Sequence, residues 1–251
     1  MFEPGKHAFG RFMGDFYASL VPTTKPMQEF CARGLQKSIA IAPGKMVDAV
    51  ESMVNSWIKN VQESENGSTR GPSKNHQFPA IIVAFAKDSP AYEREYGRPM
   101  SDAEFVQIPD DPLKRIFKLR TIGMDMRVQI VIVSHDEPSA RSIAAQFQSF
   151  VDQGDRRRFK AVYEFAQTET LWPCQIENTS VPFMNIPSDA ENLTYLGSDL
   201  TLHCTVPLFE ASPVGKGITP YGFPTVREVC YDGFHEREHV RHAIVGEKLV
   251  P

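Results

Sequence analysis

A strand, a clearly marked helix start and a second strand follow one another between Met126 and Phe165, and this unit constrains the fold more than any other segment. The first strand, 126–134, is rich in β-branched residues that alternate with period two, so one face is apolar throughout and the other is polar only at its start. Such a strand runs from a half-exposed edge into a place covered on both sides. The unit therefore predicts a sheet with helices lying over it.

A helix is predicted directly after this strand. Asp136 is a good N-cap residue, Glu137 places negative charge at the helix start, and Pro138 fits the first turn, where its missing N–H would have no partner. Gly154 and the basic residues after it end the helix, and residues 159–165 alternate again as a second strand. Apolar residues recur at helical spacing between these limits, at Ala140, Ile143, Ala144, Phe147 and Val151.

Further segments add extended structure on both sides of this unit. Residues 78–86 are predicted to form a buried strand. Residues 115–122 are followed by Gly123 and then by the strand at 126–134, and two strands so closely joined indicate an antiparallel hairpin. Residues 193–209 are expected to form another strand, and residues 199–208 within it alternate cleanly. The fold class is therefore α+β: a mixed, mainly antiparallel sheet with helices packed on it, plus extended N- and C-terminal arms.

Three parts are predicted along the chain. Residues 1–42 mix aromatic residues with Gly and Pro and are interpreted as an N-terminal arm. Residues 43–210 form the α+β core domain, which begins with an amphipathic helix at 45–61 and includes a polar, proline-containing surface excursion at 87–112. Residues 211–251 are rich in Gly and Pro and then charged, and they are interpreted as a C-terminal extension that leaves the domain.

Composition limits the classes of function. The formal net charge is −4, which argues against a protein whose main role is to coat nucleic acid. No run of apolar residues is long enough to span a membrane, and the N-terminus lacks the pattern of a secretion signal. These features predict a soluble protein that is made in a cytoplasm.

The chain has four cysteines, Cys31, Cys174, Cys204 and Cys230. None of them has the C-x-x-C spacing that is typical of zinc or redox sites. Reduced and mostly buried thiols are therefore expected, because disulfides are rare in cytoplasmic proteins.

One short motif matches a catalytic pattern. His235, Glu236 and His239 fit the H-E-x-x-H pattern of zinc proteases, in which two histidines one turn apart bind zinc and the glutamate activates a water. The intervening Arg237 and Glu238 are both charged, whereas a helix that holds a buried zinc would need apolar residues there. A solvated charged segment is the favoured interpretation. No catalytic, cofactor-binding or metal-binding residue is therefore predicted.

Two other groups of polar residues have structural interpretations. His135 and Asp136, at the end of a strand, could form a catalytic pair, but the helix cap explains Asp136 without any catalysis. The basic run Arg156–Arg158, with Lys160, could face phosphate, but a charged turn that caps the C-terminus of a helix explains it better.

In the order and residue patterns of these elements, the chain resembles the tail terminator and neck (collar) proteins of long-tailed bacteriophages, which join the tail to the head. In that family a small α+β domain carries an N-terminal helix, a curved sheet that contains a hairpin, and a helix packed on the sheet. The resemblance covers roughly residues 43–210. The corresponding pieces are the predicted helix at 45–61, the strand at 78–86, the hairpin at 115–134, the helix at 139–151 and the strands at 159–165 and 193–209.

The resemblance implies a structural virion protein rather than an enzyme. Its members form homo-oligomeric rings, most often hexamers, that cap the tail tube, halt its growth and provide the surface on which the head docks. The arms and the excursion would suit a contractile-tailed phage, in which the ring also contacts sheath and collar partners. The implied location is the virion, after synthesis in the host cytoplasm, with no membrane and no cofactor. DNA would pass through the lumen without specific binding, since an acidic chain repels its phosphates.

Two alternatives stay open. One is a zinc-dependent hydrolase that uses His235, Glu236 and His239, and the other is a monomeric protein-interaction module. The first predicts bound zinc, the second predicts a monomer, and the tail protein predicts a ring.

Overall fold

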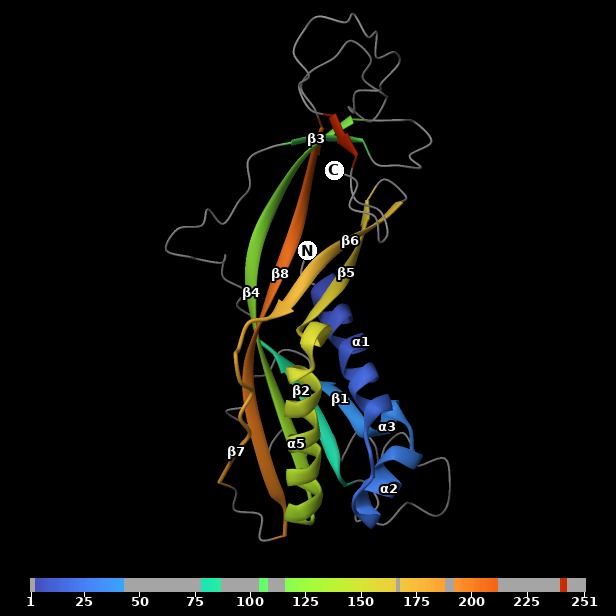
Figure 1. Ribbon diagram of the computed structural model, residues 1–251, viewed down its shortest axis with the longest axis vertical. Helices are drawn as coiled ribbons and strands as arrows, with labels where there is room; N and C mark the ends of the chain where they lie inside the picture. Colours follow the sequence, from blue (N-terminus) through green and yellow to red (C-terminus); the bar gives the residue numbers. More distant parts are fainter. Residues whose placement is uncertain are drawn as a thin grey trace, which may run out of the picture.

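The computed structural model describes residues 3–42, 78–86, 104–107, 116–165, 168–187, 192–211 and 240–242. They form one sheet with helices against it, which confirms the predicted α+β fold (Figure 1). The helices are α1 (Glu3–Ser19), α2 (Lys25–Ala32), α3 (Leu35–Ser38), α5 (Glu137–Asp152) and the 3-10 helix η3 (Gly154–Arg157). The strands are β1 (Ile39–Ala42), β2 (Ala80–Phe85), β3 (Glu104–Gln107), β4 (Ile116–Ser134), β5 (Arg158–Phe165), β6 (Thr168–Ile176), β7 (Met184–Asn185), β8 (Thr194–Ala211) and β9 (Val240–His242).

The sheet is mixed and mainly antiparallel, as predicted. Its main path follows the order β1-β2-β4-β8-β6-β5, while β3 pairs with β4 and β9, and β7 pairs with β8. The β1–β2 and β3–β9 pairs are parallel, and the other pairs of described strands are antiparallel. The sheet therefore has β1 at one end of its path and β5 at the other.

Two very long strands form the spine of the molecule. β4 has 19 residues and β8 has 18, and they pair along their whole length, from Phe117 opposite Ala211 to Ser134 opposite Thr194. At about 3.3 Å per residue, β4 spans about 60 Å. The predicted hairpin at 115–134 is therefore wrong, because one continuous strand runs through Gly123. A two-residue hairpin turn needs positive φ angles, and the described glycines with positive φ are Gly34 and Gly154.

A change of buried face explains why the sequence suggested two strands. At the upper end of β4 in Figure 1, the buried side chains are those of Phe117 and Leu119, at odd-numbered positions. Further along, they are those of Met126 and Val128, at even-numbered positions. The register between β4 and β8 contains no bulge, so the twist of the ribbon turns a different face toward the core at each end.

The N-terminal segment belongs to the core, and its prediction as an arm is wrong. Residues 3–42 form α1, α2, α3 and β1. The side chains of Phe9, Phe12 and Phe16 are buried along one face of α1 and contact aromatic rings of β2, α5 and β5. Burying one such ring stabilises a fold by about 1.5–3 kcal/mol, so the domain boundary predicted at residue 43 does not separate an arm from a core.

The predicted helix after the first strand is confirmed. α5 begins after Asp136, whose carboxylate accepts a hydrogen bond from the Ser139 amide at 2.9 Å, as an N-cap does. Its buried face includes Ile143, Phe147 and Val151. α5 lies along the lower half of the β4–β8 ribbon (Figure 1), so the prediction of a helix-covered sheet holds there.

β5 and β6 form a hairpin that extends from the lower core, and its tip packs against the upper part of the β4–β8 ribbon. The Phe165 ring near its tip stacks on Phe209 of β8 at 4.3 Å between centroids, and both rings contact Phe117 of β4 edge-on. This aromatic cluster supports the upper half of the ribbon, where α5 does not reach (Figure 1).

Several predictions fall wholly or partly outside the described residues. The predicted helix at 45–61 lies there, as does most of the C-terminal extension. The excursion predicted at 87–112 contains β3, which pairs with β4, and the extension contains β9, which pairs with β3. Both segments thus contribute at least one strand to the sheet.

Candidate functional site

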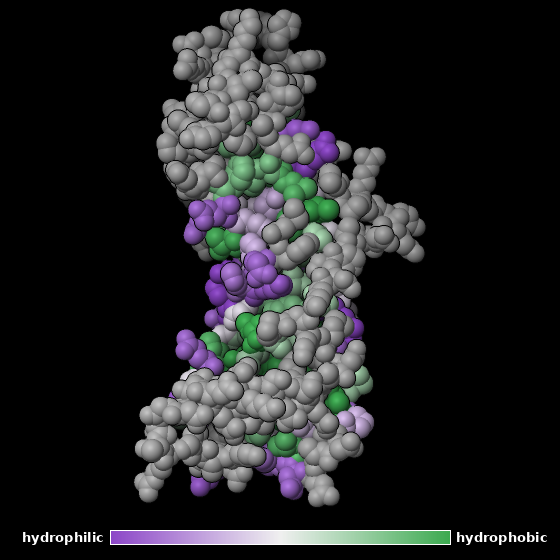
Figure 2. Space-filling view, turned by 180° about the vertical axis from the view of Figure 1, so that it is seen from behind, coloured by the Kyte–Doolittle hydropathy of each residue, from purple (hydrophilic) through white to green (hydrophobic). Residues whose placement is uncertain are grey.

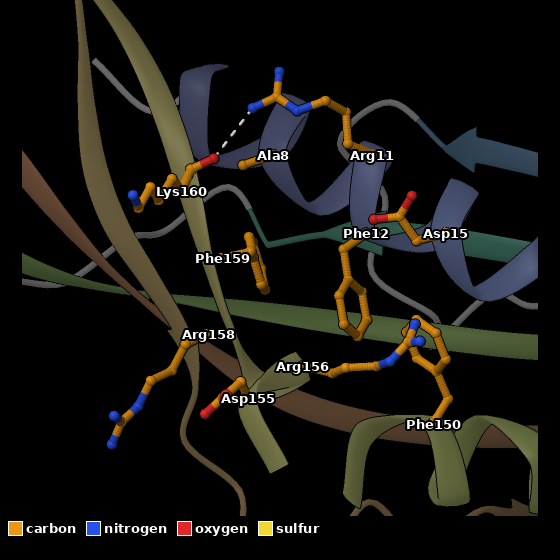
Figure 3. A pocket seen from close by; sticks show the side chains of 10 residues that line it. All are labelled: Ala8, Arg11, Phe12, Asp15, Phe150, Asp155, Arg156, Arg158, Phe159 and Lys160. Carbon is orange, nitrogen blue, oxygen red and sulfur yellow. Dashed lines mark hydrogen bonds between the residues drawn. The ribbon is translucent and has the colours of Figure 1, made fainter. Parts of the chain in front are cut away.

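A shallow hollow of about 580 Å³ lies between α1, η3 and β5 (Figure 3). The rings of Phe12, Phe150 and Phe159 form its apolar floor. Arg11 reaches from α1 and donates a hydrogen bond to the Lys160 carbonyl at 3.2 Å, which covers part of the outer edge of the terminal strand β5. A charged residue that covers a strand edge in this way hinders unwanted pairing with another chain.

The predicted basic run at this hollow divides into structural and outward-facing residues. Arg157 donates hydrogen bonds to the carbonyls of Val151, Asn178 and Thr179, and so joins the end of α5 to the loop after β6. The guanidinium of Arg156 lies over the Phe150 ring at 4.4 Å. These contacts agree with the interpretation of a charged turn at the C-terminus of a helix.

The side chain of Arg158 is oriented differently from those of Arg156 and Arg157, and it has the same orientation as that of Lys160. Both side chains are exposed and point away from α1, toward the opposite side of β5 (Figure 3). Neither side chain makes an ion pair with any residue that the structure describes. These two positive charges are therefore available on the outer face of the β5–β6 hairpin.

Two negative charges lie on the same outer face, near the tip of the hairpin. Glu164 of β5 lies directly opposite Glu169 of β6, and both residues are exposed. Like charges that face each other across two strands are destabilising. Sequence reasoning missed this pair, because only the register between the strands brings the two glutamates together.

A second, apolar hollow of about 170 Å³ lies on the other side of α1, at the β1 edge of the sheet. Its lining includes Phe9, Met13 and Leu35. Ile41 of β1 also lines it and is 57% exposed, although it is a large apolar residue. Exposed apolar surface next to a terminal strand is a common feature of protein contact sites.

The His135–Asp136 turn has a structural role. The Asp136 carboxylate accepts hydrogen bonds from the Ser139 amide and the Ser134 hydroxyl. The His135 ring packs edge-on against Phe78 at 4.9 Å, and its Nδ1 lies 3.2 Å from the Asn192 carbonyl oxygen. These contacts occupy both side chains, as expected for a cap rather than a catalytic pair.

Polar groups also cross the middle of the long ribbon. Arg127 forms an ion pair with Asp199, with 2.5 Å between nitrogen and oxygen, and His203 Nδ1 lies 2.9 Å from Asp125 Oδ1. Figure 2 shows the back of the molecule, where hydrophilic residues gather at mid-height between more hydrophobic regions above and below. The ribbon therefore has no continuous apolar stripe on this described surface.

Two cysteines face each other inside the core. Cys174 of β6 and Cys204 of β8 are opposite in register, with their sulfur atoms 3.4 Å apart. The hydrogen bond to Cys174, together with burial, raises the pKa of the Cys204 thiol. Cys31 is also a free thiol, while Cys230 lies outside the described residues. Cys174 and Cys204 are buried, as predicted for most of the cysteines, while Cys31 is only partly buried.

The described residues offer no metal site. No group of three or more His, Cys, Asp or Glu side chains gathers within them in a way that could hold an ion. His235, Glu236 and His239 fall outside the described part of the chain, so the zinc alternative stays a prediction.

None of the described helices is long and apolar enough to cross a membrane. No protein-family model matches this sequence, and no curated protein matches it.

Proposed function

We propose that this chain is a structural virion protein that forms a homo-oligomeric ring at the head-proximal end of a phage tail. The ring would cap the tail tube and join it to the neck, and the sheath and connector proteins would be its partners. The observation that carries the proposal is the β4–β8 ribbon, which is about three times longer than the mean strand of about 5–6 residues.

The ribbon is longer than the lower core requires. β2 pairs with β4 only from Ala80 opposite Val133 to Phe85 opposite Val128. Above this level the ribbon carries its own aromatic cluster and the β3–β9 pair (Figure 1). An element that extends far from the lower core suits a protein whose surface is shared with neighbouring subunits.

A ring also needs two different surfaces that fit each other, because its contacts are heterologous. The apolar hollow at the β1 edge, with exposed Leu35 and Ile41, is one candidate. The upper part of the ribbon, on the far side of the lower core, is the other. Their separation along the molecule (Figure 1) favours assembly from one subunit to the next.

The proposal is tested by adding the full-length chain to polymerised tail tubes of the same phage and examining them by negative-stain electron microscopy. A terminator is expected to cap one end of each tube and to stop further addition of tube protein. The variant Ile41→Asp should weaken the cap, whereas Glu137→Gln, on the exposed start of α5, should leave it intact. Tubes that keep growing with both ends bare would contradict the proposal.

A further inference from the structure

The outer face of the β5–β6 hairpin has an ordered charge pattern. Residues on this face alternate with the buried Ala161 and Tyr163, which point inward. At the base of the hairpin the face carries Arg158 and Lys160. At its tip it carries the opposed pair Glu164 and Glu169, and between them lie Val162 and Leu171, which are opposite in register and only partly buried. From the base of the hairpin to its tip, the charge on this face therefore changes from positive, through an uncharged apolar middle, to negative.

Neither end of this face is neutralised by a residue that the structure describes. The cross-strand neighbours of Arg158 and Lys160 are Gln175 and Pro173, which carry no charge. No ion pair of the described residues includes Glu164 or Glu169. Each end thus holds two like charges that repel each other, and a partner with the opposite pattern would relieve both repulsions together.

The pattern is complementary to itself. Lys160 and Glu164 are four residues apart on one strand, which corresponds to about 13 Å. A second copy can be turned by 180° about an axis that lies just above this face, parallel to the line from Val162 to Leu171. The negative tip of each copy then lies over the positive base of the other. The apolar residues then meet at the centre. This is the arrangement of an isologous two-fold contact.

We propose that the outer face of the β5–β6 hairpin is a self-association surface, which binds the same face of a second copy of this chain in antiparallel orientation. Arg158 and Lys160 of each copy contact Glu164 and Glu169 of the other. α1 packs on the inner side of β5 and leaves this face accessible (Figure 3). The contact is small and mainly electrostatic, so it is weak and sensitive to salt. It does not depend on the proposed ring, which uses other surfaces.

Two variants test the contact. Glu164→Lys with Glu169→Lys makes the face wholly positive, and Arg158→Glu with Lys160→Glu makes it wholly negative. All four side chains are exposed, so both variants are expected to fold, and their thermal unfolding is compared with that of the original chain. Self-association of the full-length chain is measured by sedimentation equilibrium at low ionic strength and again at about 1 M salt, where the Debye length is about 3 Å.

The original chain should dimerise at low salt and dissociate at high salt. Each variant alone should bind itself at least roughly tenfold more weakly, because attraction becomes repulsion. An equal mixture of the two variants should restore association, since the wholly positive face fits the wholly negative one. The control Glu3→Lys with Asp15→Lys changes the net charge as the first variant does, but on exposed positions of α1, and should associate normally.

Three results would overturn the contact. They are an original chain with no salt-sensitive association, a variant that associates as the original chain does, and a mixture that fails to associate. Rings that form equally well from both variants would leave the proposed function in place, because the proposed ring uses other surfaces.

Discussion

At the scale of single residues, Asp136 shows how one side chain fixes the start of an element. Partial burial acts to raise its pKa, but hydrogen bonds from Ser139 and Ser134 outweigh burial, and the net pKa of the carboxyl is lowered. The charged form is therefore bound more tightly in the folded state than in the unfolded state. The same carboxylate satisfies one of the free amides of the first turn of α5.

Replacing this cap should destabilise the protein in a defined way. Asp136→Ala is expected to lower the free energy of unfolding by about 1 kcal/mol, whereas Asp136→Asn keeps an acceptor and should cost less. Chemical denaturation at neutral pH measures both. Equal losses in the two variants would show that the side chain does not act as a cap.

The lowered pKa of Asp136 also predicts how the stability of the protein changes with pH. Because its folded-state pKa lies below the unfolded value of about 3.9, its stabilisation is complete above that value and is lost as the pH falls through the folded pKa. The Asn variant should lose less stability than the original chain between neutral pH and about pH 3. A larger loss in the Asn variant would contradict this assignment.

The buried thiols give a second prediction at this scale. Cys174 and Cys204 are 1% and 3% exposed, so alkylation should reach them only when the protein unfolds. Cys31 is partly exposed, and burial raises its pKa, so it should react before the buried pair and faster at alkaline pH. Mass spectrometry of alkylated peptides resolves each site. Rapid labelling of Cys174 in the native protein would contradict the buried pair.

At the scale of elements, local signals in the sequence were sufficient for α5 and insufficient for α1. The cap at Asp136 and the helical spacing after it are local, so the helix could be predicted with its start. In α1, Phe9, Phe12 and Phe16 also have helical spacing, but the segment contains glycines, each of which costs about 1 kcal/mol in a helix. Packing against distant strands offsets that cost, and such packing cannot be deduced from the segment alone.

The same limit applies to the long ribbon and to the candidate surfaces. The alternation of residues 159–165 predicted the strand β5 itself. The opposition of Glu164 and Glu169 depends on the register with β6, and the continuity of β4 through Gly123 depends on pairing with β8. Contacts between residues far apart in sequence decide both features.

The docking of α1 is tested at Gly5. A Cβ atom there would lie 2.9 Å from the Cys204 sulfur, which is too close for a packed core. Gly5→Ala is therefore expected to destabilise the protein by about 1–3 kcal/mol despite the better helix propensity of alanine. In a Cys204→Ala background the cost should shrink, because the sulfur is absent. Equal costs in both backgrounds, measured by chemical denaturation, would contradict this packing.

At the scale of the whole molecule, the protein combines a helix-covered lower core with an upper ribbon that extends beyond it (Figure 1). The two hollows lie beside α1, one next to β5 and one next to β1. The ring proposed above needs two different surfaces of this kind on each subunit, because its contacts are heterologous.

Deletion of residues 213–251 tests the role of the C-terminal extension. It removes β9, which pairs with only three residues of β3, and leaves the β4–β8 pairing intact. The truncated chain should keep its helix and strand content by circular dichroism and should assemble less well than the full chain. Loss of soluble folded protein would show that the extension is part of the core.

The measurement that tests the central claim most directly is the symmetry and mass of the full-length protein in solution. Mass photometry and two-dimensional class averages from electron microscopy are recorded for the chain alone and with tail tube protein. The ring proposal predicts closed particles with a central hole and a hexameric mass, at least when tube protein is present. Particles of monomeric or dimeric mass without a central hole, under both conditions, would contradict it.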